Sequence, residues 1–91
     1  MTKPAFDAIW RRIAGLAGQV FHTKTGLEFT FELSGNVVTT SRTEYNLSRA
    51  DFETAYSHVP LSGPAEINDL VRGPAYIWAI LHDERVTGGA W

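Results

Sequence analysis

A strict alternation of apolar and polar side chains runs along residues 27–33 and leaves little choice of local structure. Successive side chains of a β-strand point to opposite faces, so the pattern predicts a strand with one buried face. Residues 19–23 before it and the β-branched residues 37–40 with Ser41 after it are joined to it by glycine-containing turns. Together the segments predict a three-stranded antiparallel β-meander.

An amphipathic helix is predicted ahead of these strands. Pro4 suits a first helical turn, and Gly18 suits the end of the helix. The apolar residues between them recur at spacings of three and four, which places them on one helix face that can cover the sheet. They are Phe6, Ile9, Trp10, Ile13, Leu16, Ala17 and Val20.

Ser48-Arg49-Ala50-Asp51 predicts the start of a second helix. In a capping box of this kind Ser48 accepts from the Asp51 N–H, and the Asp51 carboxylate reaches back to the Ser48 N–H. Pro60 then ends the helix, because the residue before a proline is pushed out of the helical region.

The last third of the chain contains two Gly-Pro pairs, Gly63-Pro64 and Gly73-Pro74, each of which suits a helix start. Residues 75–81 are apolar on every side and must be central; periodicity alone leaves helix or strand open, and the Gly-Pro pair favours helix. The expected fold is therefore α+β, with an N-terminal helix, the meander and two to three C-terminal helices packed on the sheet. Residues 1–86 would form a single domain and residues 87–91 a flexible tail.

Composition excludes several functional classes. The 91 residues allow one domain, and the absence of cysteine excludes disulfides, thiolate zinc sites and thiol catalysis. Residues 1–7 lack an apolar signal-peptide core, and the longest apolar run, seven residues, is far below the roughly 20 that span a bilayer. We expect a cytoplasmic protein without a membrane partner.

No catalytic or metal motif is present in the sequence. His22, His58 and His82 fall on different predicted elements without ligand spacing, and no serine lies in a G-x-S-x-G elbow. We therefore expect neither enzyme activity nor a cofactor, and a small hydrolase or metal-dependent enzyme is the third of three hypotheses.

Arg72-Gly73-Pro74 is the sharpest candidate for anion binding. The free N–H groups and the dipole at a helix start favour an anion, and Arg72 can clamp a phosphate with two hydrogen bonds. The alternative is that Arg72 pairs with an acidic residue such as Asp69, Glu66 or Asp83.

Residues 59–71 resemble the hairpin of the helix-hairpin-helix family. The matching positions are Pro60, Gly63, Ile67 and Leu70, whereas Leu61 and Ser62 stand where the family has glycine and an apolar residue. The resemblance implies binding of DNA phosphates by the N-terminus of the second helix of the hairpin.

The formal charge of −2 conceals an uneven distribution, because residues 1–49 carry a net +2 and residues 50–91 a net −4. The basic half can form a local basic face from Arg11, Arg12, Lys24, Arg42 and Arg49, with Tyr45 as a base-stacking residue. The leading hypothesis is a non-enzymatic module that binds nucleic acid, DNA above all. Its predicted anion-binding residues are Arg11, Arg12, Lys24, Arg42, Tyr45 and Arg72.

The sequence contains 11 aromatic residues, more than so small a core is expected to hide. Tryptophan and tyrosine are favoured at protein interfaces, and Trp91 follows two glycines at the end of the chain. The second hypothesis is therefore a protein-interaction subunit, a homodimer or larger assembly, with Trp91 in the interface.

Overall fold

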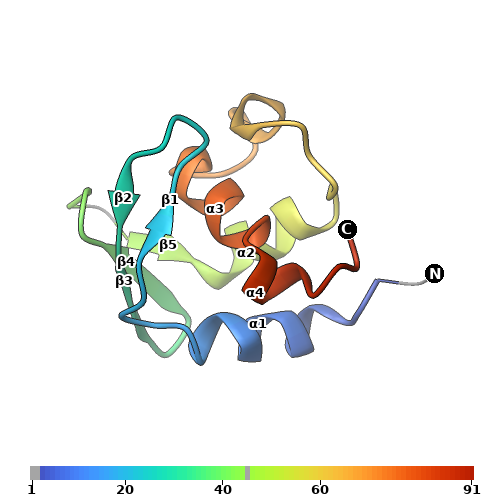
Figure 1. The fold of residues 1–91 in the computed structure, drawn as a ribbon, viewed down its shortest axis with the longest axis horizontal. Coiled ribbons are helices and arrows are strands. Elements are labelled where there is room, and N and C mark those ends of the chain that lie inside the picture. Colours follow the sequence, from blue (N-terminus) through green and yellow to red (C-terminus); the bar gives the residue numbers. More distant parts are fainter. Residues whose placement is uncertain (1–2, 45) are drawn as a thin grey trace.

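The computed structural model describes residues 3–44 and 46–91 and confirms the α+β class (Figure 1). An N-terminal helix is followed by antiparallel strands and then by further helices. The helices are α1 (Phe6–Ala14), α2 (Arg49–Tyr56), the 3-10 helix η1 (Pro64–Ile67), α3 (Pro74–Leu81) and α4 (Glu84–Thr87). The strands are β1 (Phe21–His22), β2 (Glu28–Phe29), β3 (Phe31–Ser34), β4 (Val37–Thr40) and β5 (Asn46–Ser48).

The strand predicted over residues 27–33 is divided in two at Thr30. β2 pairs with β1, with Phe21 opposite Phe29, whereas β3 pairs with β4 in a separate three-stranded sheet. The Thr30 N–H donates to the Ser41 hydroxyl at 3.0 Å, and the Ser41 N–H donates to the Thr30 carbonyl at 2.9 Å. These bonds replace a regular ladder where the strand changes partner, and the side-chain alternation still buries Phe29 and Phe31.

The third strand of that sheet, β5, is not part of the predicted meander. Its residues pair with β4, with Val38 opposite Leu47, and lead directly into α2. Ser48 accepts from the Asp51 N–H at 3.1 Å, as the capping box predicts. The other predicted hydrogen bond of the box, from the Ser48 N–H to the Asp51 carboxylate, is replaced by a bond from the Arg72 main-chain N–H to that carboxylate.

The first helix, α1, is shorter than its apolar pattern indicates. The helix ends at Ala14, and the Gly18 N–H donates to the Phe31 carbonyl at 2.9 Å, which draws the chain away from the helix towards β3. Val20, which the pattern places on the buried face, is 46% exposed. The buried face of α1 consists of Ile9, Trp10 and Ile13.

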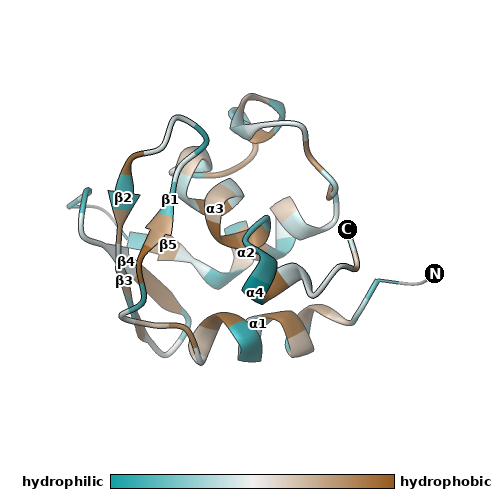
Figure 2. Cartoon of the chain, viewed as in Figure 1, coloured by the Kyte–Doolittle hydropathy of each residue, from teal (hydrophilic) through white to brown (hydrophobic). Residues whose placement is uncertain are grey.

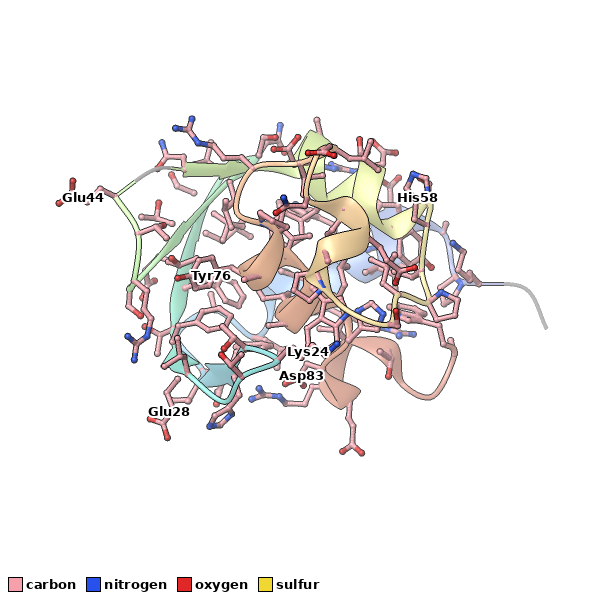
Figure 3. The ribbon with its side chains drawn as sticks, turned by 90° about the horizontal axis from the view of Figure 1, so that it is seen from above. Lys24, Glu28, Glu44, His58, Tyr76 and Asp83 are labelled. Atoms are coloured by element: carbon pink, nitrogen blue, oxygen red, sulfur yellow. The ribbon has the colours of Figure 1, made fainter. Side chains whose placement is uncertain are left out.

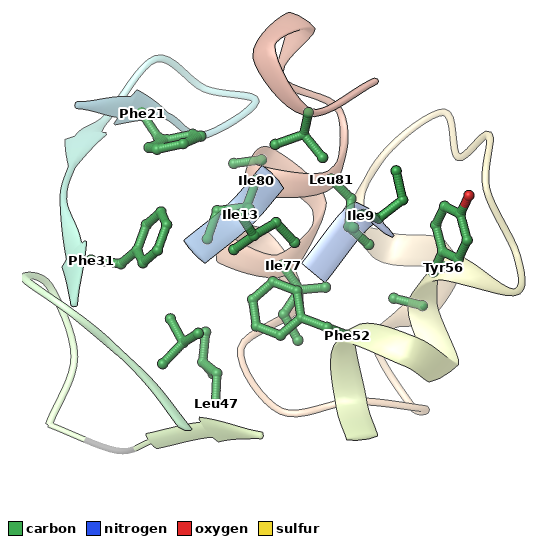
Figure 4. Close-up of a cluster of buried hydrophobic side chains, with 14 of the residues drawn as sticks. Ile9, Ile13, Phe21, Phe31, Leu47, Phe52, Tyr56, Ile77, Ile80 and Leu81 are labelled. Carbon is green, nitrogen blue, oxygen red and sulfur yellow. The ribbon is translucent and has the colours of Figure 1, made fainter. Parts of the chain in front are cut away.

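Residues 74–81 form a helix, α3, at the centre of the molecule. Gly73 has a φ of 62°, in the left-handed region that glycine tolerates, and turns the chain into Pro74. Figure 2 shows the hydrophobic character of this helix, and Figure 4 shows Ile77 in one cluster with Phe31 and Leu47 of the sheet and Phe52 of α2. One buried cluster therefore joins the sheets to all the helices.

The C-terminal segment packs against the rest of the molecule. Asp83 caps α4, which the sequence analysis does not predict, by accepting from the Arg85 N–H at 2.9 Å. The Trp91 indole N–H donates to the Leu81 carbonyl at 3.0 Å, and its ring lies 5.1 Å from that of Tyr56. The tail predicted over residues 87–91 is thus docked on the molecule.

The expectation that the chain has more aromatic residues than its core can hide is wrong for the described part of the chain. Every aromatic residue there is buried or half-buried. The rings fill the core by packing against one another between elements, as Trp10 does on Phe52 at 5.5 Å and Phe29 on Tyr76 at 5.1 Å. No aromatic surface among these residues supports the protein-interaction hypothesis.

No helix in residues 3–44 and 46–91 is long and apolar enough to cross a membrane.

Candidate anion-binding surface

Three of the predicted basic residues are anchored on main-chain carbonyls of distant segments. Arg12 Nη1 donates to the Val86 carbonyl at 2.8 Å, Lys24 Nζ to that of Ser62 at 2.9 Å, and Arg42 Nε to that of Glu28 at 2.6 Å. A carbonyl oxygen is neutral, so it fixes the side chain without cancelling its charge. Lys3, which the sequence analysis does not place on the basic face, is held in the same way by the Tyr56 carbonyl at 2.8 Å.

Two other arginines are paired with carboxylates. Arg49 bonds to Asp7 of α1, and its guanidinium lies over the rings of Phe6 at 5.5 Å and Trp10 at 5.7 Å. Arg49 therefore differs from the three anchored residues, because a carboxylate neutralises its charge where it ties α2 to α1.

Arg85 donates to both carboxylate oxygens of Asp83, from Nε to Oδ1 at 2.8 Å and from Nη2 to Oδ2 at 2.9 Å. These hydrogen bonds lower the pKa of Asp83 and raise that of Arg85, because each charge favours the other. A further bond from Arg85 Nη2 reaches the Val20 carbonyl at 2.8 Å, and the guanidinium lies 4.3 Å from the Phe21 ring centre. Arg85 thus connects α4 to β1.

The predicted anion site before α3 already contains a carboxylate. Asp51 Oδ2 accepts from the Arg72 N–H at 3.1 Å, beside the helix start. The N–H groups of Tyr76 and Ile77 in the first turn bond to the Gly73 carbonyl at 3.1 and 3.2 Å. An internal anion and the local turn therefore occupy the place at which the sequence predicts a phosphate.

The segment that resembles the helix-hairpin-helix family has a similar internal carboxylate. Where that resemblance implies a second helix, the structure has the four-residue η1. Glu66 in η1 accepts from both the main-chain N–H and the hydroxyl of Ser62, and these bonds lower the pKa of Glu66. A phosphate at this helix start would face that carboxylate.

A chain of contacts connects Arg12, Arg85 and Arg42, which we call the arginine band; within it the charge of Arg85 is paired with Asp83. Arg12 bonds to Val86, the neighbouring residue is Arg85, and Arg85 bonds to Val20. Val20 and Glu28 line a shallow hollow of about 180 Å³, and Arg42 is anchored on the Glu28 carbonyl at its edge. The other lining residues are Phe29, Thr30 and Ser41.

The remaining predicted residues lie around this band or outside it. Arg11 is exposed beside Arg12 on α1. Figure 3 shows Lys24 in the same half of the molecule as Glu28 and Asp83, whereas Arg72 lies at the start of α3. Tyr45 lies outside the described residues.

Arg85 is not among the anion-binding residues predicted from the sequence. Its only sequence signal is the short spacing Asp83-x-Arg85, which fits both a helix cap and a local ion pair. The hydrogen bond to Val20, 65 positions away, cannot be inferred from that spacing.

Metal ligation finds no support in the described part of the chain, where no three His, Asp or Glu side chains come together as a metal site. No family model, no curated protein and no solved structure matches this chain. Its function is therefore inferred from the geometry of its own side chains.

Proposed function

We propose that this domain is a non-enzymatic binding module that holds the phosphate backbone of duplex DNA against the arginine band. The observation that carries the proposal is the anchoring of Arg12 and Arg42 on neutral carbonyls. A guanidinium has five N–H groups, and one bond to a carbonyl leaves the others for phosphate oxygens. Because the side chains are already positioned, they lose less conformational entropy when a phosphate binds.

Two acidic side chains beside the band have a polar partner, and a third, Glu84 next to Arg85 on α4, is exposed. Asp83 is bonded to Arg85, and Glu28 lies 3.6 Å from His22 across the β1–β2 pair. Pairing with the Arg85 guanidinium reduces the repulsion of a phosphate by Asp83. With a net charge of −2 the chain has no long-range attraction for DNA, so affinity has to come from these local contacts.

Contacts to phosphate position a protein on DNA but carry no sequence information. The described aromatic residues are buried in the core or half-buried against it, and none is an exposed platform for unpaired bases. The proposal therefore favours duplex DNA without sequence preference over single strands.

The test is the affinity of the purified protein for a short duplex of random sequence, measured by fluorescence anisotropy. Affinity should fall steeply between about 50 and 200 mM salt. The double change Arg12→Gln and Arg42→Gln should weaken binding about tenfold or more. It should also reduce the log–log slope of affinity against salt by about 0.9 for each phosphate that the variant no longer neutralises.

Lys3→Gln is the charge-matched control, because it removes one positive charge that is also anchored on a carbonyl, that of Tyr56 in α2, but that does not belong to the band. This variant should retain the affinity of the unaltered protein. Absence of binding at about 50 mM salt would overturn the proposal, and so would equal losses from Lys3→Gln and from Arg42→Gln.

A further inference from the structure

Two side chains of α3 and its C-terminal end hold the main chain of Leu61 on both of its polar groups. The Trp78 indole N–H donates to the Leu61 carbonyl at 3.1 Å, and the Leu61 N–H donates to His82 Nε2 at 3.0 Å. Trp78 and His82 lie one helical turn apart, and their rings stack with centres 5.1 Å apart and planes 13° apart. We call this arrangement the Leu61 clasp.

The clasp requires a neutral imidazole. His82 Nε2 accepts a hydrogen bond from an N–H group, so it carries no proton. Nδ1 lies 3.1 Å from the Trp78 carbonyl, which can only accept, so the ring proton is on Nδ1. Both ring nitrogens are thus committed in one tautomer.

The surroundings of His82 oppose protonation. Burial lowers the pKa of His82 below its ordinary value of 6.5, although the Trp78 carbonyl and the charge of Glu66 act in the other direction. The Glu66 carboxylate is itself bonded to Ser62. The other charged groups around this segment are Lys24, on the Ser62 carbonyl, and Asp83, which is bonded to Arg85.

We propose that His82 is a pH-sensitive latch: neutral His82 holds the segment 60–63 through the Leu61 main chain, and protonation of His82 releases it. A proton on Nε2 would place two donors, Nε2–H and the Leu61 N–H, about 3.0 Å apart, where neither can accept from the other. The hydrogen bond then breaks, and the Leu61 main chain leaves the imidazole.

The consequences reach the residues next to Leu61. Leu61 is only 7% exposed, so movement of the segment uncovers apolar surface. Ser62 holds Lys24 through its carbonyl and Glu66 through its N–H and hydroxyl. Protonation of one ring therefore loosens the contacts that tie the turn at Lys24 and η1 to this segment.

Amide hydrogen exchange, followed residue by residue by NMR, tests the latch without any ligand. The observed exchange rate of the Leu61 amide, divided by its intrinsic exchange rate, gives the opening constant of the clasp. For the unaltered protein this constant should rise about tenfold for each pH unit below about 6.5, until His82 is protonated in the closed state as well. In His82→Gln the side-chain oxygen can accept from the Leu61 N–H and does not titrate in this range, so the rise should disappear.

His58→Gln is the matched control, because His58 is exposed and its removal leaves the clasp intact. This variant should keep the pH profile of the unaltered protein. Identical Leu61 profiles in the unaltered protein and in a folded His82→Gln would overturn the proposal.

A second measurement does not depend on a variant. In the unaltered protein the ring nitrogens of His82 and the amide of Leu61 should titrate with one midpoint, with Nε2 unprotonated above it. A Leu61 amide signal that does not move as His82 titrates would contradict the latch as directly as the exchange result.

Discussion

The carboxylate of Asp51 accepts a hydrogen bond from the main-chain N–H of Arg72 at 3.1 Å, and this bond joins the first turn of α2 to the start of α3. The two residues are 21 positions apart. The carboxylate lies beside the positive end of the α3 dipole, where the sequence predicts an external phosphate. The chain thus uses one of its own anions to fix the start of its central helix.

Removal of that anion should destabilise the fold. Asp51→Ala leaves the Arg72 N–H without this acceptor and should lower the free energy of unfolding by about 1–2 kcal/mol. Asp51→Asn keeps an acceptor oxygen and should lose less. Urea unfolding measures both, with Glu53→Ala as the control, since Glu53 is exposed on the same helix and should change stability by less than about 0.5 kcal/mol.

Arg49 should contribute more to stability than its ion-pair partner Asp7. The Asp7 side chain is 76% exposed and that of Arg49 34% exposed, so the pair itself should couple by less than about 1 kcal/mol. Arg49→Ala also loses the packing of the guanidinium over Phe6 and Trp10. A double-mutant cycle in urea separates the two contributions, and equal losses from Asp7→Ala and Arg49→Ala would show that the packing on the rings contributes nothing.

A third prediction concerns the contribution of Trp91, at the docked C-terminus, to stability. Trp91→Phe keeps an aromatic ring near Tyr56 but loses the hydrogen bond to the Leu81 carbonyl, at a cost of about 1 kcal/mol. Deletion of residue 91 removes the ring as well and should cost more. Thermal unfolding followed by near-ultraviolet circular dichroism measures the difference, and an unchanged midpoint after deletion would mean that the tail is loose in solution.

Local signals explain why much of the fold could be predicted. The stripe containing Ile9 and Ile13 identifies α1, and Ser48 marks the start of α2, because helix periodicity and N-capping each depend on a few neighbouring residues. The division of the long strand could not be predicted, because the bond that stabilises it joins Thr30 to Ser41 across 11 positions.

The candidate site was harder to predict for a different reason. The sequence shows which residues carry charge, and Arg12 and Arg42 were identified in that way. Their acceptors are the carbonyls of Val86 and Glu28, a group that every residue has, so no sequence pattern marks them. The internal carboxylates could not be predicted as anion-site occupants either. The sequence around Asp51 indicates only a capping box on its own helix, and the Arg72 N–H that it binds is 21 positions away.

The Asp83–Arg85 pair should make stability depend on acid pH. Hydrogen bonds from Arg85 hold the pKa of Asp83 below its ordinary value of 3.8, so the folded state takes up a proton at this carboxyl less readily than the unfolded chain. The stabilisation is therefore fully present above pH 3.8 and is lost as the pH falls below that value through the pKa of the folded state. Asp83→Asn keeps an oxygen that can cap α4 but loses the charge.

Urea unfolding of the unaltered protein and of Asp83→Asn at a series of pH values tests this. The variant should be less stable by about 1 kcal/mol near neutral pH, and the difference should shrink as the pH falls below the ordinary pKa of Asp83. Asp69→Asn, the same change at an exposed carboxylate, is the control for the amide substitution itself. A difference for Asp83→Asn that persists undiminished in acid would show that the charge of Asp83 does not stabilise the fold.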